Sequence, residues 1–129
     1  MSSPKTIFII DDDPVISKLL EKRLAAEGYV VKTFEFGEDC LEALVEKPDL
    51  VVLDYLFSKS GREVMNGMEI FDRIRKADIS TPVIMLSGQG KGDIVLEFAR
   101  KGIEDYIIKD NNLVDNLLGA IKELFSREH

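Results

Sequence analysis

The chain has 129 residues, of which 45% are hydrophobic and 32% charged, a balance typical of a globular domain. Its single cysteine, Cys40, excludes an internal disulfide, and no apolar run approaches the ~20 residues that a membrane span requires. The net charge of −7 argues against a nucleic-acid-binding surface, because phosphate recognition needs a basic patch. With one thiol and no signal-peptide pattern, we expect a cytoplasmic protein of one domain, residues 1–129, with its core at about 6–125.

Two kinds of apolar segment alternate along the chain. Short continuous runs rich in β-branched residues predict buried parallel strands at Thr6–Ile10, Val30–Phe34, Leu50–Leu53, Val83–Leu86 and Tyr106–Ile108. Stretches with apolar residues at helical spacing come after each run, marked by Leu20 and Leu24, Leu41 and Leu44, Phe71 and Ile74, Val95 and Phe98, and Leu117 and Ile121. This alternation predicts an α/β fold in which a parallel sheet is covered by helices on both faces.

Local signals mark the ends of the expected helices. Asp13 followed by Pro14 predicts an N-cap with proline at the first helical position. Gly28 and Gly102 come after the first and fourth expected helices, where a left-handed C-cap commonly occurs. The polar stretch Ser58–Val64 has no apolar periodicity, and we expect it to run over the surface.

Polar side chains lie just after four of the expected strands. Asp11–Asp13 come after the first strand, Asp54 after the third, Ser87 after the fourth and Lys109 after the fifth. Ligands of open α/β sheets bind at the carboxyl ends of the strands, so we expect these side chains to share one pocket. Taken singly, each has an ordinary explanation, as a helix cap in the case of Asp13 or as a solvated strand end. The whole set is what indicates a site.

The chemistry of this set favours phosphoryl transfer. Clustered carboxylates repel one another unless a cation is present, and Mg²⁺ prefers oxygen ligands. A carboxylate can act as a nucleophile and form an acyl phosphate. An ammonium and a hydroxyl group can contact the phosphoryl oxygens, and this reaction needs mostly positioning and neutralisation of charge.

The same residues resemble the receiver domains of two-component response regulators, of which the chemotaxis receiver is a single-domain member. The motifs are Phe8–Pro14, Val51–Asp54, Pro82–Gly88 and Asp105–Lys109. Any one motif is weak, but all of them in order on the expected strands are specific. The resemblance implies a flavodoxin-like (βα)5 fold, a doubly wound five-stranded parallel sheet in the order 2-1-3-4-5.

The resemblance also implies roles for particular residues. Asp54 matches the phosphoacceptor, and Lys109 matches the lysine that accompanies it. The implied cofactor is Mg²⁺ or Mn²⁺, held by Asp11, Asp12, Asp54 and the backbone carbonyl of Leu56. The implied phosphodonor is a sensor histidine kinase or a histidine phosphotransfer protein. The domain would act as a phosphorylated switch rather than as an enzyme, with slow autodephosphorylation at most.

Ser87 and Tyr106 match the switch residues of the family. The resemblance implies an output face formed by the fourth helix, the fifth strand and the fifth helix, which contacts an output domain or a protein partner. We expect no direct contact with nucleic acid or membrane, and a monomer or a weak phosphorylation-dependent dimer. Leu56 and Gln89 offer few groups to guide water to an acyl phosphate, which leaves the dephosphorylation rate open.

The chain departs from the family pattern in two further places. Gly67 of the Asn-Gly pair lies 13 positions after Asp54 (67 − 54), so the loop that contains Ser58–Val64 is several residues longer than usual and lacks the usual Met-Pro. The lysine of the family is normally followed by a cis proline, but Lys109 is followed by Asp110. A cis bond without proline costs about 3–4 kcal/mol, so the sequence leaves open whether this bond is cis or trans.

Three alternatives remain open on sequence alone. An aspartate-nucleophile phosphatase of the haloacid dehalogenase type would share the Asp-x-Asp pattern of Asp11–Asp13, but would need Gly-Thr or a similar pair where this chain has Pro14-Val15. A flavodoxin-type or Rossmann-type nucleotide-binding module would need a Gly-rich first turn, and this turn is acidic. A degenerate receiver would keep the fold as a scaffold without being phosphorylated. The sequence also does not decide between a single-domain regulator and part of a longer one.

Overall fold

A computed structural model of the chain describes residues 3–55, 67–77, 80–88 and 100–127. Its strands form one parallel sheet in the order β2-β1-β3-β4-β5, so the flavodoxin-like topology is confirmed. The strands are β1 (Thr6–Ile10), β2 (Val30–Phe34), β3 (Leu50–Asp54), β4 (Val83–Ser87) and β5 (Asp105–Ile108). The chain order reverses direction beside β1, which places a switch point between β1 and β3 at the carboxyl edge of the sheet.

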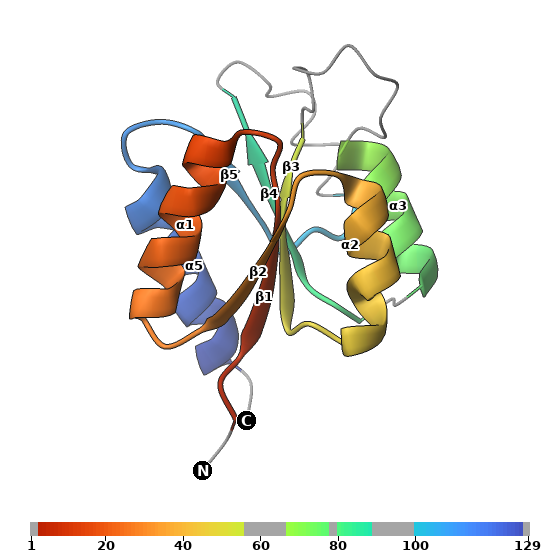
Figure 1. Ribbon diagram of the computed structural model, residues 1–129, viewed down its shortest axis with the longest axis horizontal. Helices are drawn as coiled ribbons and strands as arrows, with labels where there is room; N and C mark the ends of the chain where they lie inside the picture. The colour runs from red at the N-terminus through yellow and green to blue at the C-terminus, as the bar shows by residue number, and fades with distance from the viewer. Residues whose placement is uncertain (1–2, 56–66, 78–79, 89–99, 128–129) are drawn as a thin grey trace.

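Helices cover both faces of the sheet (Figure 1). On one face lie α1 (Pro14–Ala26) and α5 (Leu113–Ser126). On the other lie α2 (Gly37–Ala43), which continues into the 3₁₀ turn η1 (Leu44–Glu46), and α3 (Gly67–Ala77). The expected fourth helix, with Val95 and Phe98, falls outside the described residues. Among the helices that are described, none is long and apolar enough to cross a membrane.

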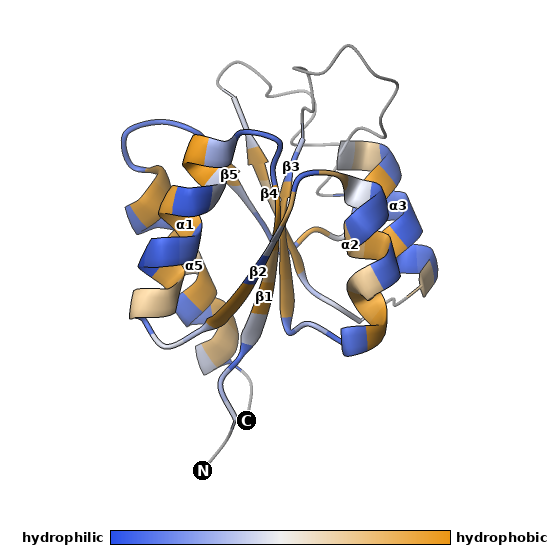
Figure 2. Ribbon diagram, in the orientation of Figure 1, coloured by the Kyte–Doolittle hydropathy of each residue, from blue (hydrophilic) through white to orange (hydrophobic). Residues whose placement is uncertain are grey.

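The core has two layers, one on each side of the sheet. Alternate residues of β1 point to opposite sides: Ile7 and Ile9 pack with α1 and α5, whereas Phe8 and Ile10 pack with α2 and α3. Figure 2 shows the apolar strands between helices in which hydrophobic and hydrophilic residues alternate. Each fully buried side chain of this size contributes roughly 1.5–3 kcal/mol to the stability of the fold. These layers hold the strand ends in fixed positions.

The expectation that every strand is buried on both faces is wrong for the two edge strands. Val30 of β2 is 50% exposed and Ile108 of β5 is 39% exposed, because each strand has a neighbour on only one side. The inner strands β1, β3 and β4 are almost wholly buried. The strands β3, β4 and β5 are each one residue longer than predicted, since ladder pairing includes Asp54, Ser87 and Asp105.

The predicted ends of α1 are confirmed. The side chain of Asp13 accepts hydrogen bonds from the backbone N–H groups of Val15 and Ile16, and Pro14 opens α1. Gly28 and Gly102 adopt left-handed backbone conformations with φ of 95° and 90°. Cys40 is buried, and burial raises the pKa of its thiol to about 12, which makes it a weak nucleophile.

Candidate functional site

The turn after β1 holds Asp11 at the carboxyl edge of the sheet. The N–H of Asp11 donates to the carbonyl of Phe34 at 3.1 Å, which ties this residue to the end of β2. Asp11 Oδ1 accepts from the N–H of Asp13 at 2.9 Å, and the hydroxyl of Ser17 donates to the Asp11 carbonyl at 3.2 Å. The turn and the first turn of α1 thus fix the direction of the Asp11 carboxylate, whose exposed fraction is 0%.

The backbone around Asp54 is held from two sides. The N–H of Tyr55 donates to the carbonyl of Leu86 at 2.8 Å, and the N–H of Gly67 donates to the carbonyl of Tyr55 at 2.9 Å. A Cβ on Gly67 would lie 2.7 Å from Tyr55 Cα and 3.0 Å from the Asp54 carbonyl oxygen. Only glycine allows α3 to start this close to β3. The long loop therefore leaves at Tyr55 and returns beside it, while Leu56 and Ser58–Val64 lie outside the described residues.

Ser87 and Lys109 lie at the ends of β4 and β5. The N–H of Lys109 donates to the carbonyl of Ser87 at 2.8 Å, and the buried Ser87 hydroxyl donates to the carbonyl of Gly88 at 3.3 Å. The peptide bond between Lys109 and Asp110 is trans, since the described residues contain no cis peptide bond. In place of the cis proline, the carboxylate of Asp110 accepts from the N–H of Asn112 at 2.8 Å and shapes the turn into α5.

The ammonium of Lys109 joins two carboxylates from different strands. Lys109 Nζ lies 2.9 Å from Asp11 Oδ2 and 3.0 Å from Asp54 Oδ1. Burial alone would lower the pKa of Lys109, but its contacts with Asp11 and Asp54 outweigh that effect and raise the pKa above its ordinary value. The ammonium therefore stays charged and offsets part of the negative charge of the site.

The acidic residues leave a place for a cation. One carboxylate oxygen from each of Asp11, Asp12 and Asp54 lies within 4.8 Å of the others. Asp11 Oδ2 is buried and lies 2.9 Å from the ammonium of Lys109. Three carboxylates facing one ammonium leave an excess of negative charge. This donor set fits a hard divalent ion such as Mg²⁺.

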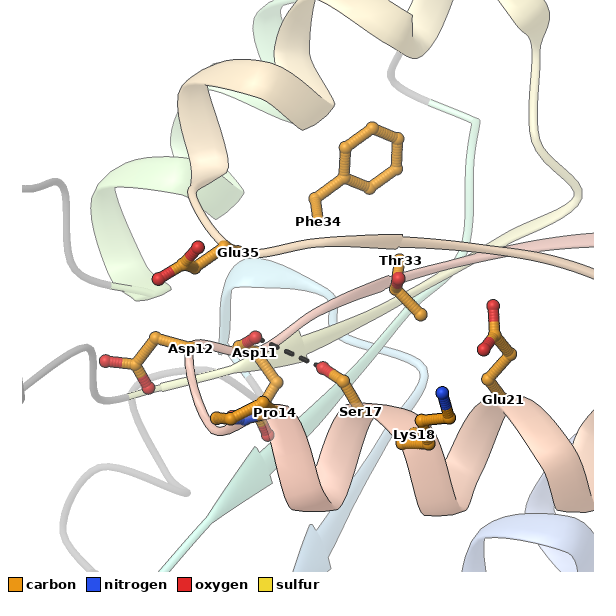
Figure 3. A pocket seen from close by; sticks show the side chains of 9 residues that line it. All are labelled: Asp11, Asp12, Pro14, Ser17, Lys18, Glu21, Thr33, Phe34 and Glu35. Atoms are coloured by element: carbon orange, nitrogen blue, oxygen red, sulfur yellow. Dashed lines mark hydrogen bonds between the residues drawn. The ribbon is translucent and has the colours of Figure 1, made fainter.

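A pocket of about 490 Å³ opens beside this cluster, between α1 and the end of β2. Its walls include Asp11 and Asp12 together with Ser17, Thr33 and Glu35. Figure 3 shows Asp12 and Glu35 at the same end of the pocket and the hydroxyl of Ser17 directed to Asp11. This pocket therefore borders the cluster at Asp11 and Asp12, whereas Asp54 does not line it.

The structure brings together most of the residues that the sequence singled out. Asp11, Asp12, Asp54 and Lys109 form one cluster, and Ser87 lies at the adjacent strand end. Tyr106 lies on β5, half-buried against the apolar layer that contains α2 and α3. The sequence did not reveal that Ser17 fixes the Asp11 turn. The one signal that could have indicated it is a hydroxyl residue six positions after Asp11.

This arrangement of carboxylates and a lysine at the switch point of a five-stranded parallel sheet defines a receiver-type signalling domain. The family model described as "Response regulator receiver domain" matches residues 7–122, and the chain belongs to this family. It is therefore a domain of two-component signalling.

Curated relatives agree with this assignment. The chain is 36% identical over 107 residues to the transcriptional regulatory protein GlrR of Escherichia coli (strain K12), a match that covers 82% of this chain and 23% of that protein. It is 33% identical over 106 residues to the alkaline phosphatase synthesis transcriptional regulatory protein PhoP of Bacillus subtilis, covering 81% of this chain and 42% of PhoP. The chain thus spans less than half of each of these relatives.

Solved structures show the same fold. The signal receiver domain of a putative Luxo repressor protein from Vibrio parahaemolyticus superposes with a TM-score of 0.83 at 26% identity, covering 96% of this chain and 92% of that one. A CheY-like response regulator receiver domain protein from Methanospirillum hungatei superposes with a TM-score of 0.82 at 28% identity, covering 97% and 96%.

Proposed function

We propose that Asp54 accepts a phosphoryl group and that the resulting charge switches the domain between two conformations. The observation that carries the proposal is the placement of the Lys109 ammonium 3.0 Å from Asp54, inside a cluster of three carboxylates of which two are buried. A carboxylate held in this way can attack phosphorus, and the ammonium can then follow the charge onto the phosphoryl oxygens.

Asp11, Asp12 and Asp54 would hold a divalent cation, Mg²⁺ or Mn²⁺, with the Leu56 carbonyl as a further expected ligand. When bound, the ion would supply positive charge that offsets the negative charge of the entering phosphoryl group. The excess of carboxylate over ammonium in this cluster supports the assignment. Ser17 and Asp13 would act by keeping the Asp11 turn in place.

The transfer step itself is simple. A carboxylate oxygen of Asp54 forms a bond to phosphorus as the phosphorus–nitrogen bond of a phosphohistidine breaks, and the imidazole leaves with the electron pair and takes a proton from solvent. Lys109 contacts the phosphoryl oxygens, and the Ser87 hydroxyl turns towards another of them. The domain is the acceptor in this reaction and does not turn over a substrate as an enzyme does.

The donor would be a sensor histidine kinase or a histidine phosphotransfer protein. The output would be an interaction with a partner protein or an attached output domain, through the face formed by the fourth helix, β5 and α5. Relatives such as GlrR and PhoP are named as transcriptional regulators, and each is more than twice as long as the matched region. With its net charge of −7, we expect this domain to affect transcription only indirectly, and to be a monomer or a weak phosphorylation-dependent dimer.

The switch would couple Ser87 to Tyr106. Ser87 is buried beside Gly88, where an added Cβ would meet nothing within 4 Å, and this glycine would leave room for the acyl phosphate towards which the hydroxyl moves. The ring of Tyr106 would then fill the vacated space, which shifts the population between two packings. NMR of the domain with a beryllofluoride acyl-phosphate mimic tests this coupling. Shifts confined to the surroundings of Asp54, with none in residues 90–110, would rule it out.

Phosphorylation by a small donor tests the central proposal and separates it from its rivals. Acetyl phosphate with Mg²⁺ should add one phosphoryl group per chain, and excess chelator should abolish the labelling. A degenerate receiver would stay unlabelled under both conditions. A phosphatase would hydrolyse many equivalents of aryl phosphate, and a nucleotide-binding module would bind ATP or FMN without being labelled. An exposed-site variant, Asp39→Asn, should label as the native chain does.

A further inference from the structure

A second surface feature lies along the edge of the sheet, between β5 and α5. A groove of about 490 Å³ is lined by the length of β5 and by Asn116, Gly119 and Ala120 of α5. Ile108 contributes an exposed aliphatic side chain at its β5 side, and Ala120 contributes a small apolar one. The groove therefore offers apolar surface outside the carboxylate cluster.

Gly119 lies in the middle of α5, where glycine weakens a helix relative to alanine. A Cβ built on Gly119 would meet nothing within 4 Å, so the packing of the domain does not require a glycine here. By contrast, a Cβ on Gly67 would collide with the backbone of Tyr55. Gly119 instead keeps a stretch of helix backbone bare at the wall of the groove. Such a position allows another chain to approach closely.

The groove is bordered by charge of one sign. Asp105, Asp110, Asp115 and Glu123 line it, and no described residue that lines it is basic. None of these four carboxylates forms an ion pair within the described part of the chain; Asp105 and Asp110 accept only backbone N–H groups. The guanidinium of Arg127 lies outside this lining and pairs with Glu104 at 2.8 Å, but its charge also acts on Asp105 and Glu123 and offsets part of their negative charge.

We propose that the β5–α5 groove docks a cationic amphipathic helix of a partner protein. Its small or apolar residues would lie against Gly119 and Ile108, and its Lys or Arg side chains would meet the four carboxylates. A second copy of this chain fits less well, because symmetric pairing would place the same four carboxylates opposite one another. This inference deepens the output role proposed above by naming the chemistry of the partner.

Synthetic peptides test the occupant on the full chain. The probe is a helical peptide of about five turns with a Leu/Ala face and a Lys face, and its control carries Glu at every Lys position. The Lys peptide should shift the amide signals of Tyr106, Asn116 and Gly119 in NMR spectra, and its affinity should fall as salt rises. Equal binding of the Glu peptide, or shifts elsewhere only, would overturn the proposal. So would self-association of the free chain that shifts the same residues.

Matched charge variants test the location. Asp115→Asn with Glu123→Gln should weaken the Lys peptide by about tenfold. Asp39→Asn with Glu42→Gln removes the same charges from exposed sites on α2 and should leave the affinity within about twofold. Equal losses in both pairs would mean attraction to net charge alone and would overturn the proposal.

A size variant tests the role of Gly119, and a phosphorylation assay separates the two proposals. Gly119→Gln should fold normally, since its Cβ has free space, and should weaken the peptide by obstructing the groove. Unchanged affinity would contradict the role of Gly119. All variants should still accept a phosphoryl group from acetyl phosphate. Failure of the docking proposal would therefore be distinguishable from failure of the phosphoacceptor proposal.

Discussion

The ammonium of Lys109 lies 3.0 Å from Asp54 Oδ1, although β4 separates the strands to which the two residues belong. The lysine crosses the end of β4, where its N–H is held by the Ser87 carbonyl at 2.8 Å. The same ammonium lies 2.9 Å from Asp11. Lys109 is therefore the internal counter-ion of the site, and a cation held by Asp11, Asp12 and Asp54 would share two of these carboxylates with it.

This sharing predicts how Lys109→Met behaves. Without divalent ions, the variant should lose about 1–3 kcal/mol of stability, because two buried carboxylates lose their partner. Mg²⁺ should bind it at least as tightly as it binds the native chain and should restore part of the loss. Urea unfolding with and without Mg²⁺ measures both effects. Lys122→Met, which removes an exposed ion pair to Glu27, should change stability by less than about 1 kcal/mol. A Lys109→Met variant with no response to Mg²⁺ would contradict the shared site.

The pH dependence of stability depends on the raised pKa of Lys109. Burial opposes the charged form, but the ion pairs outweigh it and raise this pKa in the folded chain above the ordinary 10.5. Their contribution is complete below the ordinary value and is lost as pH rises through the folded value. The difference in unfolding free energy between the native chain and Lys109→Met should therefore shrink above pH 10.5. Taking the difference between the two chains removes the effect of tyrosine titration. A constant difference through this range would show that the contacts do not stabilise the charged form.

Gly67 is predicted to be essential for the position of Asp54. Gly67→Ala places a methyl group 2.7 Å from Tyr55 Cα, so either α3 or the Asp54 backbone must move. We expect a loss of about 1–3 kcal/mol and slower labelling by acetyl phosphate, even under conditions in which the variant is fully folded. Gly119→Ala is the matched control, since its added methyl is unobstructed, and should stabilise the domain by about 0.5–1 kcal/mol. If folded Gly67→Ala were labelled as fast as the native chain, Gly67 would have no role in positioning Asp54.

The long loop between Tyr55 and Gly67 can be shortened without moving its ends, because the hydrogen bond between these two residues closes it. Trimming the segment to the usual length of the family should change stability by less than about 1 kcal/mol. If the loop selects partners, transfer from the cognate kinase should change while labelling by acetyl phosphate does not. If both rates stay unchanged, the insertion has no role in partner selection.

Much of this fold could be predicted from the sequence, because apolar runs and helix caps are local signals. The limits of β1 and β2 were predicted to the residue, and the cap at Asp13 was confirmed. The exposure of β2 was missed, since a continuous apolar run does not show whether a strand lies at the edge of a sheet.

The site could be predicted as a set of residues but not as a set of contacts. The strand ends placed Asp11, Asp54 and Lys109 at one edge. The Lys109 side chain reaches across β4 to both carboxylates. This contact depends on side-chain conformation and on the order of strands in the sheet, which no local sequence pattern encodes. In the same way, the contact of Gly67 with Tyr55 joins the two ends of a long loop and has no signal in either segment.

The most direct test of the account is to locate the phosphoryl group. The native chain is labelled with acetyl phosphate and Mg²⁺, reduced with borohydride to convert an acyl phosphate into homoserine, and digested for mass spectrometry. Homoserine is expected at position 54 in the native chain and is expected to be absent from Asp54→Asn, which should keep the fold because the two side chains are nearly isosteric. Homoserine at another aspartate, or undiminished labelling of Asp54→Asn, would contradict this expectation.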